Sequence, residues 1–337
     1  MTSIDDDAFS GCSSLTSITV PNSVTSIGWS AFYGCSSLTH ITIPHSVTSI
    51  GSGAFGGCSS LTNITIPDSV IFIGYLAFDG CSSLTSINIP NSVKVISESA
   101  FSGCSKLTSI TIPDSVTYID MAAFSGCTSL SSIIVSENNP NYSSQDGILY
   151  NKAKTEIVHV PKAISGAVSI PDGVTYISFY YCTLLESITI PDSVTSIGYH
   201  AFYGCRRLTS ITIPDSVTRI DDYAFKDCPI ETATIPAMAC SYINNSALKT
   251  VVITSGDSIG NKAFQGCSSL TSITIPDGVT SIGMWAFNSC FKLTSINFNG
   301  TTEEWKAITK YWDSNTGDYT VYCTDGTVAK DGTVTKN

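Results

Sequence analysis

The sequence predicts a repeat solenoid, a stack of coils made mainly of short parallel β-strands joined by short helical or 3-10 turns. Two observations favour this fold class. Cysteines recur at a fixed spacing of 23 residues, at Cys12, Cys35, Cys58, Cys81, Cys104 and Cys127. Later copies carry the same column at Cys182, Cys205, Cys228, Cys267 and Cys290, so 11 of the 13 cysteines belong to it and only Cys240 and Cys323 lie outside. Charged residues are 13% of the chain, about half of the ~25% usual in globular proteins, so Ser and Thr must supply much of the surface.

One copy, Leu38 to Ser60, shows how each coil is expected to fold. Ile41 and Ile43 alternate with Thr42, which is the period of two expected of a strand with one buried face. Pro44 lacks the N–H that would continue a ladder, so we expect it to end the strand and to occupy the first central position of a turn. The segment VTSIG is a second short extended piece, and AFxxC is long enough for about one helical turn.

A single copy buries too few side chains to offset the entropy of ordering its backbone, so the copies must stack and share their buried faces. The strand segments begin near Leu15, Leu38, Leu61, Leu84, Leu107, Leu130, Leu185, Leu208, Ile230, Leu248, Leu270 and Leu293. With two degenerate coils between Leu130 and Leu185, the sequence predicts about fourteen coils in all.

The repeat LxxIxIPxxVxxIGxxAFxxCxx resembles the BspA-like subclass of leucine-rich repeats, found mostly in bacterial surface proteins and in some protist surface proteins. The resemblance covers about residues 4 to 298 and extends to the interruption NPNYSSQDGILYNKAKTEIVHVP and to the terminal INFNGTTEEWKAI. It implies a right-handed leucine-rich-repeat superhelix with a parallel sheet on one face. It also implies adhesion or protein binding, a cell-surface or secreted location, and no catalytic residues.

The pattern predicts a solenoid over residues 1–300 and a C-terminal cap over 301–337, where Thr301 and Glu304 have the spacing of a helix capping box. Two breaks interrupt the solenoid. Residues 136–164 read as irregular coils with a projecting hairpin, or alternatively a ligand-contacting loop, and residues 228–248 as a coil shortened to 18 residues. The chain opens in the middle of a repeat, which we interpret as a fragment boundary.

Composition and motifs argue against several function classes. The net charge of -11 and the pI near 4.6, without a Lys/Arg cluster, disfavour nucleic acid as a partner. No apolar run is long enough to span a membrane. No HExxH, GxSxG or phosphate-binding loop accompanies the four histidines His40, His45, His159 and His200, so we expect no enzyme activity and no cofactor.

Metal binding is also not expected. Equivalent cysteines in successive coils point the same way, so they should be reduced, buried thiols rather than disulfides or zinc ligands, and a thiol reagent should label at most Cys240 and Cys323. A column of Asp and Asn follows the repeat proline, as in Asp68 and Asp114. Asp and Asn side chains satisfy the backbone groups of a turn, which is the favoured interpretation. The alternative is a row of calcium sites, although a single column of side chains supplies too few oxygens for each ion.

The most varied column follows the repeat glycine, and it is the first candidate for partner contact. Aromatic side chains at exposed positions are typical binding anchors. The predicted binding edge therefore consists of Trp29, Tyr75, Met121, Tyr199, His200, Tyr223, Met284 and Trp285. The alternative is that these side chains merely cover the convex side of the coils.

Three functions remain open at this stage. The first is a non-catalytic adhesion module that binds a protein, such as a host extracellular-matrix or cell-surface protein. The second is a structural spacer that carries other domains of a longer polypeptide. The third is ice binding by the regular outward Ser and Thr rows, such as Ser17 and Thr19.

Overall fold

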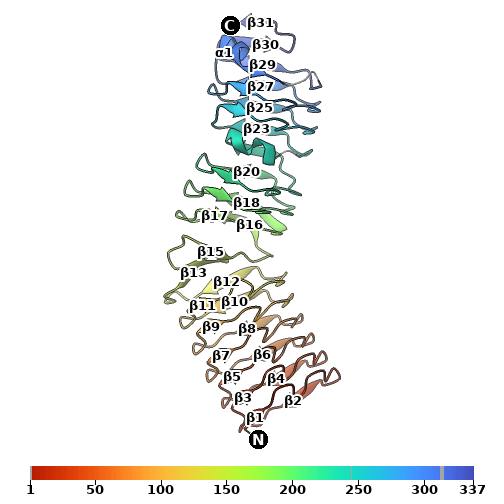
Figure 1. Ribbon diagram of the computed structural model, residues 1–337, viewed down its shortest axis with the longest axis vertical. Helices are drawn as coiled ribbons and strands as arrows, with labels where there is room; N and C mark the ends of the chain where they lie inside the picture. The colour runs from red at the N-terminus through yellow and green to blue at the C-terminus, as the bar shows by residue number, and fades with distance from the viewer. Residues whose placement is uncertain (1, 244, 312–314) are drawn as a thin grey trace. The chain divides into compact units, whose positions relative to one another are not determined.

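The computed structural model describes residues 2–243, 245–311 and 315–337. The chain divides into two compact units, Met1–Ile164 and Ser165–Asn337, which we call unit 1 and unit 2. Each unit is a solenoid of short parallel strands, and one short α-helix and one 3-10 helix are present among the described residues (Figure 1). The predicted fold class, with about fourteen coils, is confirmed.

Unit 1 contains two parallel ladders that follow the repeat. The longer ladder pairs strands one repeat apart, so that Ser17 lies beside His40 and Ile18 beside Ile41. Its members are β2 (Ser17–Thr19), β4 (His40–Thr42), β6 (Asn63–Thr65), β8 (Ser86–Asn88), β10 (Ser109–Ile112) and β12 (Ser132–Val135). The second ladder contains β1 (Ser3–Ile4), β3 (Ser26–Ile27), β5 (Ser49–Ile50) and β7 (Phe72–Ile73), followed by the pair β9 (Val95–Ile96) and β11 (Tyr118–Ile119).

The turn between the two strands differs from the expected one. Ile41 and Ile43 are buried and Thr42 is exposed, as the alternation predicts. The N–H of Val47, however, donates to the carbonyl oxygen of Pro44 at 3.0 Å. Pro44 is therefore the first residue of the turn, and His45 takes the first central position, where other coils carry Asp or Asn.

A third ladder links the AFxxC turns of successive coils. In the first coil the N–H groups of Asp7, Phe9 and Gly11 donate to the carbonyl oxygens of Trp29, Ala31 and Tyr33, at 2.7 to 2.8 Å. Asp7 and Gly11 both have positive φ, 55° and 72°. The left-handed backbone is therefore part of the coil-to-coil pairing, which explains why the repeat carries a glycine before each cysteine of unit 1.

Phenylalanine and cysteine columns form the centre of unit 1. The rings of Phe9, Phe32, Phe55, Phe78, Phe101 and Phe124 stack in order, with centroids 5.2 to 6.0 Å apart. From Cys35 to Cys127, each thiol of the column reaches back to the phenylalanine carbonyl of the coil before it, as Cys58 Sγ does to Phe32 O at 3.2 Å. Burial raises the pKa of Cys58 and Cys127 to about 12, so these thiols stay protonated.

Ser and Thr hydroxyls tie neighbouring coils together at the surface. Thr48 Oγ1 donates to Thr25 O at 3.2 Å, and Ser69 Oγ donates to Val47 O at 2.6 Å. The same bonds recur at the equivalent positions of later coils, as from Thr117 to Lys94 and from Ser115 to Val93. Their hydroxyls satisfy main-chain carbonyls, which accounts for a surface with few charges.

The interruption in unit 1 is a three-stranded antiparallel sheet of β13 (Tyr142–Gln145), β14 (Ile148–Asn151) and β15 (Ile157–His159). The two expected strand-like runs are β14 and β15. β14 packs instead of projecting, because Ile148, Leu149 and Tyr150 are fully buried, and β15 is half-buried. Asn139 secures the entry to this sheet, since its amide donates to Pro113 O and Val116 O at 2.7 and 3.0 Å.

Unit 2 repeats the solenoid arrangement with a different set of ladders. A two-stranded sheet contains β16 (Ser165–Ser169) and β18 (Leu184–Thr189). One three-stranded sheet contains β17 (Tyr176–Ile177), β19 (Ser196–Ile197) and β21 (Arg219–Ile220), and another contains β24 (Ser258–Ile259), β26 (Ser281–Ile282) and β28 (Thr309–Lys310). The longest sheet runs through β20 (Ser210–Thr212), β22 (Thr232–Ile235), β23 (Thr250–Ile253), β25 (Ser272–Ile275), β27 (Ser295–Phe298), β29 (Thr320–Cys323), β30 (Gly326–Ala329) and β31 (Val334–Lys336).

The short coil replaces its second strand with a 3-10 helix, η1 (Ala237–Tyr242), which lies between β21 and β24 in the chain. Cys240 sits in η1 and is buried, whereas Cys12 in the first coil is exposed. The expected labelling pattern is therefore wrong for these two residues. Cys240 packs inside the short coil, and Cys12 belongs to a coil with a neighbour on one side.

The C-terminal segment first continues both ladders of unit 2, since β28 pairs parallel with β26 and β29 pairs parallel with β27. Thr301 caps α1 (Thr302–Ala307) with a complete capping box: the side chain of Thr301 accepts from the Glu304 N–H, and Glu304 accepts from the Thr301 N–H. Strands β29, β30 and β31 pair antiparallel at the end of the sheet. The expected cap range includes residues 312–314, which lie outside the described residues.

Candidate functional site

Three of the predicted edge residues belong to unit 1. Trp29, Tyr75 and Met121 are all exposed, Met121 at 81%. Their column is held in place by the turn ladder, in which Gly53 N–H donates to Tyr75 O at 2.7 Å. The side chains therefore stand on a rigid backbone, with their apolar surface in solvent.

Six further apolar side chains of unit 1 are exposed, and sequence reasoning missed them: Tyr33, Ile71, Phe72, Leu76, Tyr118 and Ile134. Phe72 pairs with Ser49 in the second ladder, and Tyr118 pairs with Val95. Ile71 and Phe72 take the places of Thr48 and Ser49, so comparing this column between coils would have found them. We name Ile71, Phe72, Tyr75, Leu76, Tyr118 and Met121 the apolar edge.

Tyr118 is the polar member of the apolar edge. Its hydroxyl donates to Asp120 Oδ2 at 3.3 Å, and this carboxylate raises the pKa of Tyr118. The phenol therefore stays neutral at physiological pH. The side chains of the apolar edge are aromatic and aliphatic, as in protein-interface cores, while the coil between Leu76 and Tyr118 carries the exposed charged residues Lys94 and Glu98.

The other predicted edge residues belong to unit 2, and the structure brings three of them together. Tyr199 and His200 have ring centroids 3.9 Å apart, and Tyr223 lies 5.4 Å from His200. Tyr180, Tyr181 and Tyr203 extend this group, with Tyr203 4.9 Å from His200 and 5.2 Å from Tyr181. We name these six residues the aromatic cluster.

Sequence reasoning missed Tyr180, Tyr181 and Tyr203 because they stand in other columns. Tyr180 and Tyr203 follow the repeat phenylalanine, and Tyr181 replaces the glycine that precedes the cysteine. Tyr181 donates its N–H to Tyr203 O at 2.9 Å, as the glycines do, and has a φ of 57°. His200 and Tyr223 also have positive φ, 55° and 59°.

Charged groups surround the aromatic cluster. The ammonium of Lys226 lies 5.3 Å from the Tyr223 ring centroid and 5.8 Å from that of Tyr203. Hydrogen bonding to Tyr181 and Asp227 raises the pKa of Tyr203 to about 12. The ammonium of Lys226 and the carboxylate of Asp227 therefore already interact with rings of the aromatic cluster.

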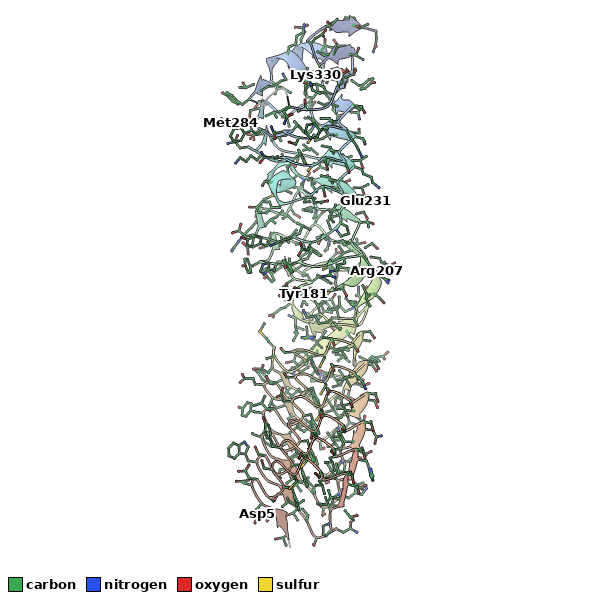
Figure 2. All side chains as sticks on the ribbon, turned by 90° about the vertical axis from the view of Figure 1, so that its right-hand side faces the viewer. Asp5, Tyr181, Arg207, Glu231, Met284 and Lys330 are labelled. Atoms are coloured by element: carbon green, nitrogen blue, oxygen red, sulfur yellow. The ribbon has the colours of Figure 1, made fainter. Side chains whose placement is uncertain are left out.

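Met284 and Trp285 lie on a later coil of unit 2, after η1. Lys262 Nζ is 5.1 Å from the Trp285 ring centroid, and the Met284 N–H donates to Asn261 Oδ1 at 2.7 Å. Met284 projects from the side of unit 2 opposite to Glu231 (Figure 2). The predicted edge of unit 2 therefore comprises two groups, one on each side of η1 along the chain.

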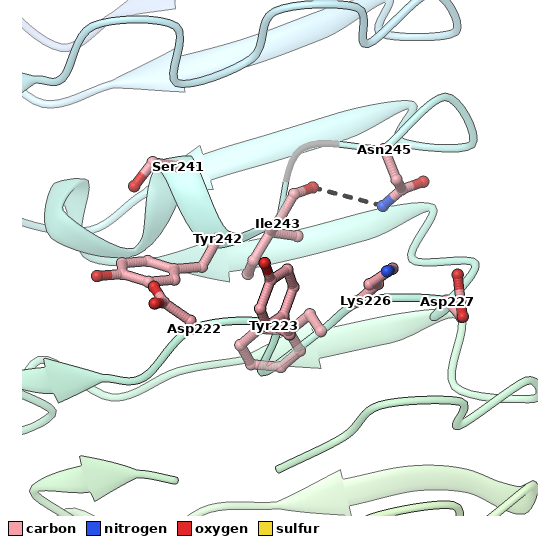
Figure 3. Close-up of a pocket in the computed structure, with 9 residues that line it drawn as sticks. Asp222, Tyr223, Lys226, Asp227, Ser241, Tyr242, Ile243 and Asn245 are labelled. Carbon is pink, nitrogen blue, oxygen red and sulfur yellow. Dashed lines mark hydrogen bonds between the residues drawn. The ribbon is translucent and has the colours of Figure 1, made fainter. Parts of the chain in front are cut away.

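A groove opens next to the aromatic cluster, where the short coil interrupts the second ladder of unit 2. It has a volume of about 610 Å³ and is lined by Asp222, Tyr223, Phe225, Lys226, Asp227, Ser241, Tyr242, Ile243 and Asn245 (Figure 3). Tyr223 belongs to both the cluster and the groove. We name this feature the polar groove, because most of the side chains that line it carry polar groups.

Potential metal ligands do not gather in the part of the chain that the structure describes. In that part of the chain, no group of three or more His, Cys, Asp or Glu side chains is placed to hold a metal ion. Within the same residues, none of the helices has the length and apolar character needed to cross a membrane. The apolar edge and the aromatic cluster are the candidate binding surfaces of units 1 and 2.

The chain was compared with known proteins. The family model described as BspA type leucine rich repeat region matches residues 1–74, 48–166, 172–255 and 244–312. A leucine-rich repeat protein from Bacteroides ovatus is 30% identical, with a TM-score of 0.59 over 91% of this chain and 82% of that chain. One from Eubacterium ventriosum is 29% identical, with a TM-score of 0.54 over 88% and 83%.

A leucine rich cell surface protein from Faecalibacterium prausnitzii is 31% identical over 92% of this chain and 86% of that chain, with a TM-score of 0.49. The comparison with curated proteins finds no match.

Proposed function

The chain belongs to the BspA type leucine-rich-repeat family, and from this premise we propose that it is a non-catalytic module that binds a protein partner through the apolar edge of unit 1. We propose a cell-surface or secreted location, as the family resemblance implies, and a host extracellular-matrix or cell-surface protein as the partner. No enzyme activity is part of this proposal.

The exposure of the apolar edge carries the proposal. Ile71 is 62% exposed and Met121 81%, on a backbone fixed by three hydrogen-bonded ladders. Leaving such side chains in water costs free energy that a partner would recover by covering them. Because the scaffold is already ordered, binding would cost little conformational entropy.

The coils themselves supply the variants that test this proposal. Ile71→Thr, Phe72→Ser and Tyr75→Ser install the residues that the preceding coil carries at Thr48, Ser49 and Ser52, so the triple variant should fold. Purified chain is tested against individually immobilised extracellular-matrix proteins at micromolar concentration. We expect a partner that the triple variant binds at least about ten-fold more weakly, because interface anchors dominate binding energy.

A matched control carries Asn63→Ser and Asn88→Thr, two substitutions on the outward side of the long ladder that also copy other coils. It should bind as the unaltered chain does. Absence of any retained matrix protein at micromolar concentration would contradict the proposal. Equal binding by all variants would also contradict the proposal, because the contact would then lie on another surface.

A further inference from the structure

We propose that the polar groove of unit 2, together with the aromatic cluster beside it, is a binding site for a neutral carbohydrate. The ligand class is an uncharged oligosaccharide. This inference concerns a different surface from the apolar edge of unit 1 and does not depend on protein binding there.

Exposed tyrosine rings provide the first half of the site. Tyr199 and Tyr223 are 58% and 54% exposed, and Tyr180 and Tyr181 are each 40% exposed. The electron-rich face of an aromatic ring attracts the weakly positive C–H groups on the apolar face of a sugar ring. The ring centroids of Tyr199 and Tyr223 lie 6.1 Å apart at an interplanar angle of 79°, so the two rings turn their faces in different directions.

Hydrogen-bonding groups provide the second half. The groove contains the carboxylates of Asp222 and Asp227, the ammonium of Lys226, the amide of Asn245 and the hydroxyl of Tyr242. In Figure 3, Asp222 and Tyr242 lie at one end of the groove, and Lys226, Asp227 and Asn245 lie toward the other. A sugar hydroxyl both donates and accepts, so it needs acceptors and donors side by side.

Charge selects a neutral ligand. Lys226 already lies over the faces of Tyr203 and Tyr223, so a cationic peptide side chain would meet a like charge there. An anionic ligand would meet Asp222 and Asp227 in a chain whose net charge is -11. The polar lining also lacks the apolar well that would anchor a peptide side chain, since Phe225 and Ile243 are both buried.

The groove has the size of a small-molecule site, and its backbone follows the pattern of unit 1. Tyr181, His200, Tyr223 and Asp227 all have positive φ, between 55° and 61°. Unit 1 has glycine at the positions that correspond to Tyr181 and Asp227, namely Gly11, Gly34, Gly57, Gly80, Gly103 and Gly126. Other coils also have positive φ at the positions of His200 and Tyr223, as at Ser30, Leu76 and Ser99, so the backbone around the groove departs from unit 1 only in the residue type at Tyr181 and Asp227. The volume of about 610 Å³ lies within the roughly 300–1,000 Å³ of small-molecule sites.

The test uses the full chain and neutral oligosaccharides of defined composition: gluco-, manno-, xylo- and chito-hexaoses. Binding is measured by isothermal titration calorimetry, and Tyr223→Ala and Asp222→Asn are compared with the unaltered chain. At least one hexaose should bind, and each variant should weaken it roughly ten-fold or more. Tyr223→Phe keeps the ring and should retain most of the affinity, which separates loss of stacking from misfolding.

Tyr75→Ala in the apolar edge is the matched control, because it removes an equally exposed tyrosine from the other unit. It should leave hexaose affinity unchanged. The proposal is overturned if no neutral hexaose binds at millimolar concentration, if only sialylated or sulfated glycans bind, or if Tyr223→Ala binds as tightly as the unaltered chain. None of these outcomes bears on the matrix-protein experiment with the Ile71, Phe72 and Tyr75 variants.

Discussion

At the residue scale, burial of the thiol group decides which cysteines can react. Eleven of the 13 cysteines are buried, while Cys12 is exposed and Cys323 is partly exposed. Only the thiolate reacts, and burial raises the pKa of Cys240, Cys267 and Cys290 to about 12. We expect a thiol reagent at pH 8 to modify Cys12 and Cys323 in the native chain and all 13 after unfolding. Mass spectrometry of the labelled peptides checks this, and rapid labelling of Cys104 would contradict the packing.

A substitution at Tyr181 compares the stabilisation from ring contacts in the aromatic cluster with the backbone strain at that position. It occupies a left-handed position, with a φ of 57°, where most other copies have glycine. Tyr181→Gly should therefore stabilise unit 2 by about 1 kcal/mol, because relief of strain outweighs the added chain entropy. Urea unfolding measures the change. Tyr180→Gly, at the neighbouring position without positive φ, should give no stabilisation; a destabilised Tyr181→Gly would show that ring contacts dominate.

His159 makes the stability of unit 1 depend on pH. Its ring meets Phe124 edge-on at 5.4 Å, and burial, with Lys162 nearby, lowers its pKa to about 4. In the unfolded chain its pKa is about 6.5, so between these values the unfolded state binds more protons. Stability should be full above pH 6.5 and fall by about 3 kcal/mol toward pH 4. In His159→Phe the loss between pH 6.5 and 5 should disappear, as followed by urea titration; an unchanged slope would assign it to other groups.

At the scale of the element, one coil depends on both of its neighbours. Phe101 is fully buried between Phe78 and Phe124, at 5.6 and 6.0 Å, whereas Phe9 stacks on Phe32 alone among the described rings and is half-buried. Phe101→Ala should cost about 3–5 kcal/mol, as large buried rings do. Phe9→Ala should cost clearly less, because its coil already meets solvent. Denaturant unfolding of both variants compares them, and equal losses would contradict the nearest-neighbour picture.

The sequence predicts the elements well because each coil obeys the same local rules. Spacing of cysteines and alternation at Ile41 and Ile43 correctly place the strands, and the capping box at Thr301 correctly places α1. The packing of β14 could not be predicted, since an apolar run of three residues fits an exposed hairpin as well as a buried one. The aromatic cluster was half predicted, because Tyr180, Tyr181 and Tyr203 come together only when different columns of neighbouring coils meet.

At the scale of the whole molecule, the ring stacking and strand pairing between successive coils are uneven along the chain. In unit 1 the phenylalanine stack runs from Phe9 to Phe124, which then meets His159 edge-on. In unit 2 a stack runs through Phe179, Phe202 and Phe225. In the sequence, the residues of the antiparallel strands β13, β14 and β15 come after Phe124 and before Phe179, and these strands pair with one another instead of following the regular coil-to-coil ladders. In a solenoid, stability is approximately a sum over coils and neighbouring interfaces, so a break in the regular ties divides cooperative units.

We therefore expect unfolding in two steps, one for Met1–Ile164 and one for Ser165–Asn337. Hydrogen exchange in increasing urea, resolved by peptide, should give two protection levels, with the boundary between residues 136 and 185. Phe101→Ala should lower the protection of unit 1 and leave that of β25 and β27 unchanged, since the substitution acts on nearest neighbours. One protection level throughout, lowered everywhere by Phe101→Ala, would mean that the antiparallel strands couple coils as strongly as the regular repeat does.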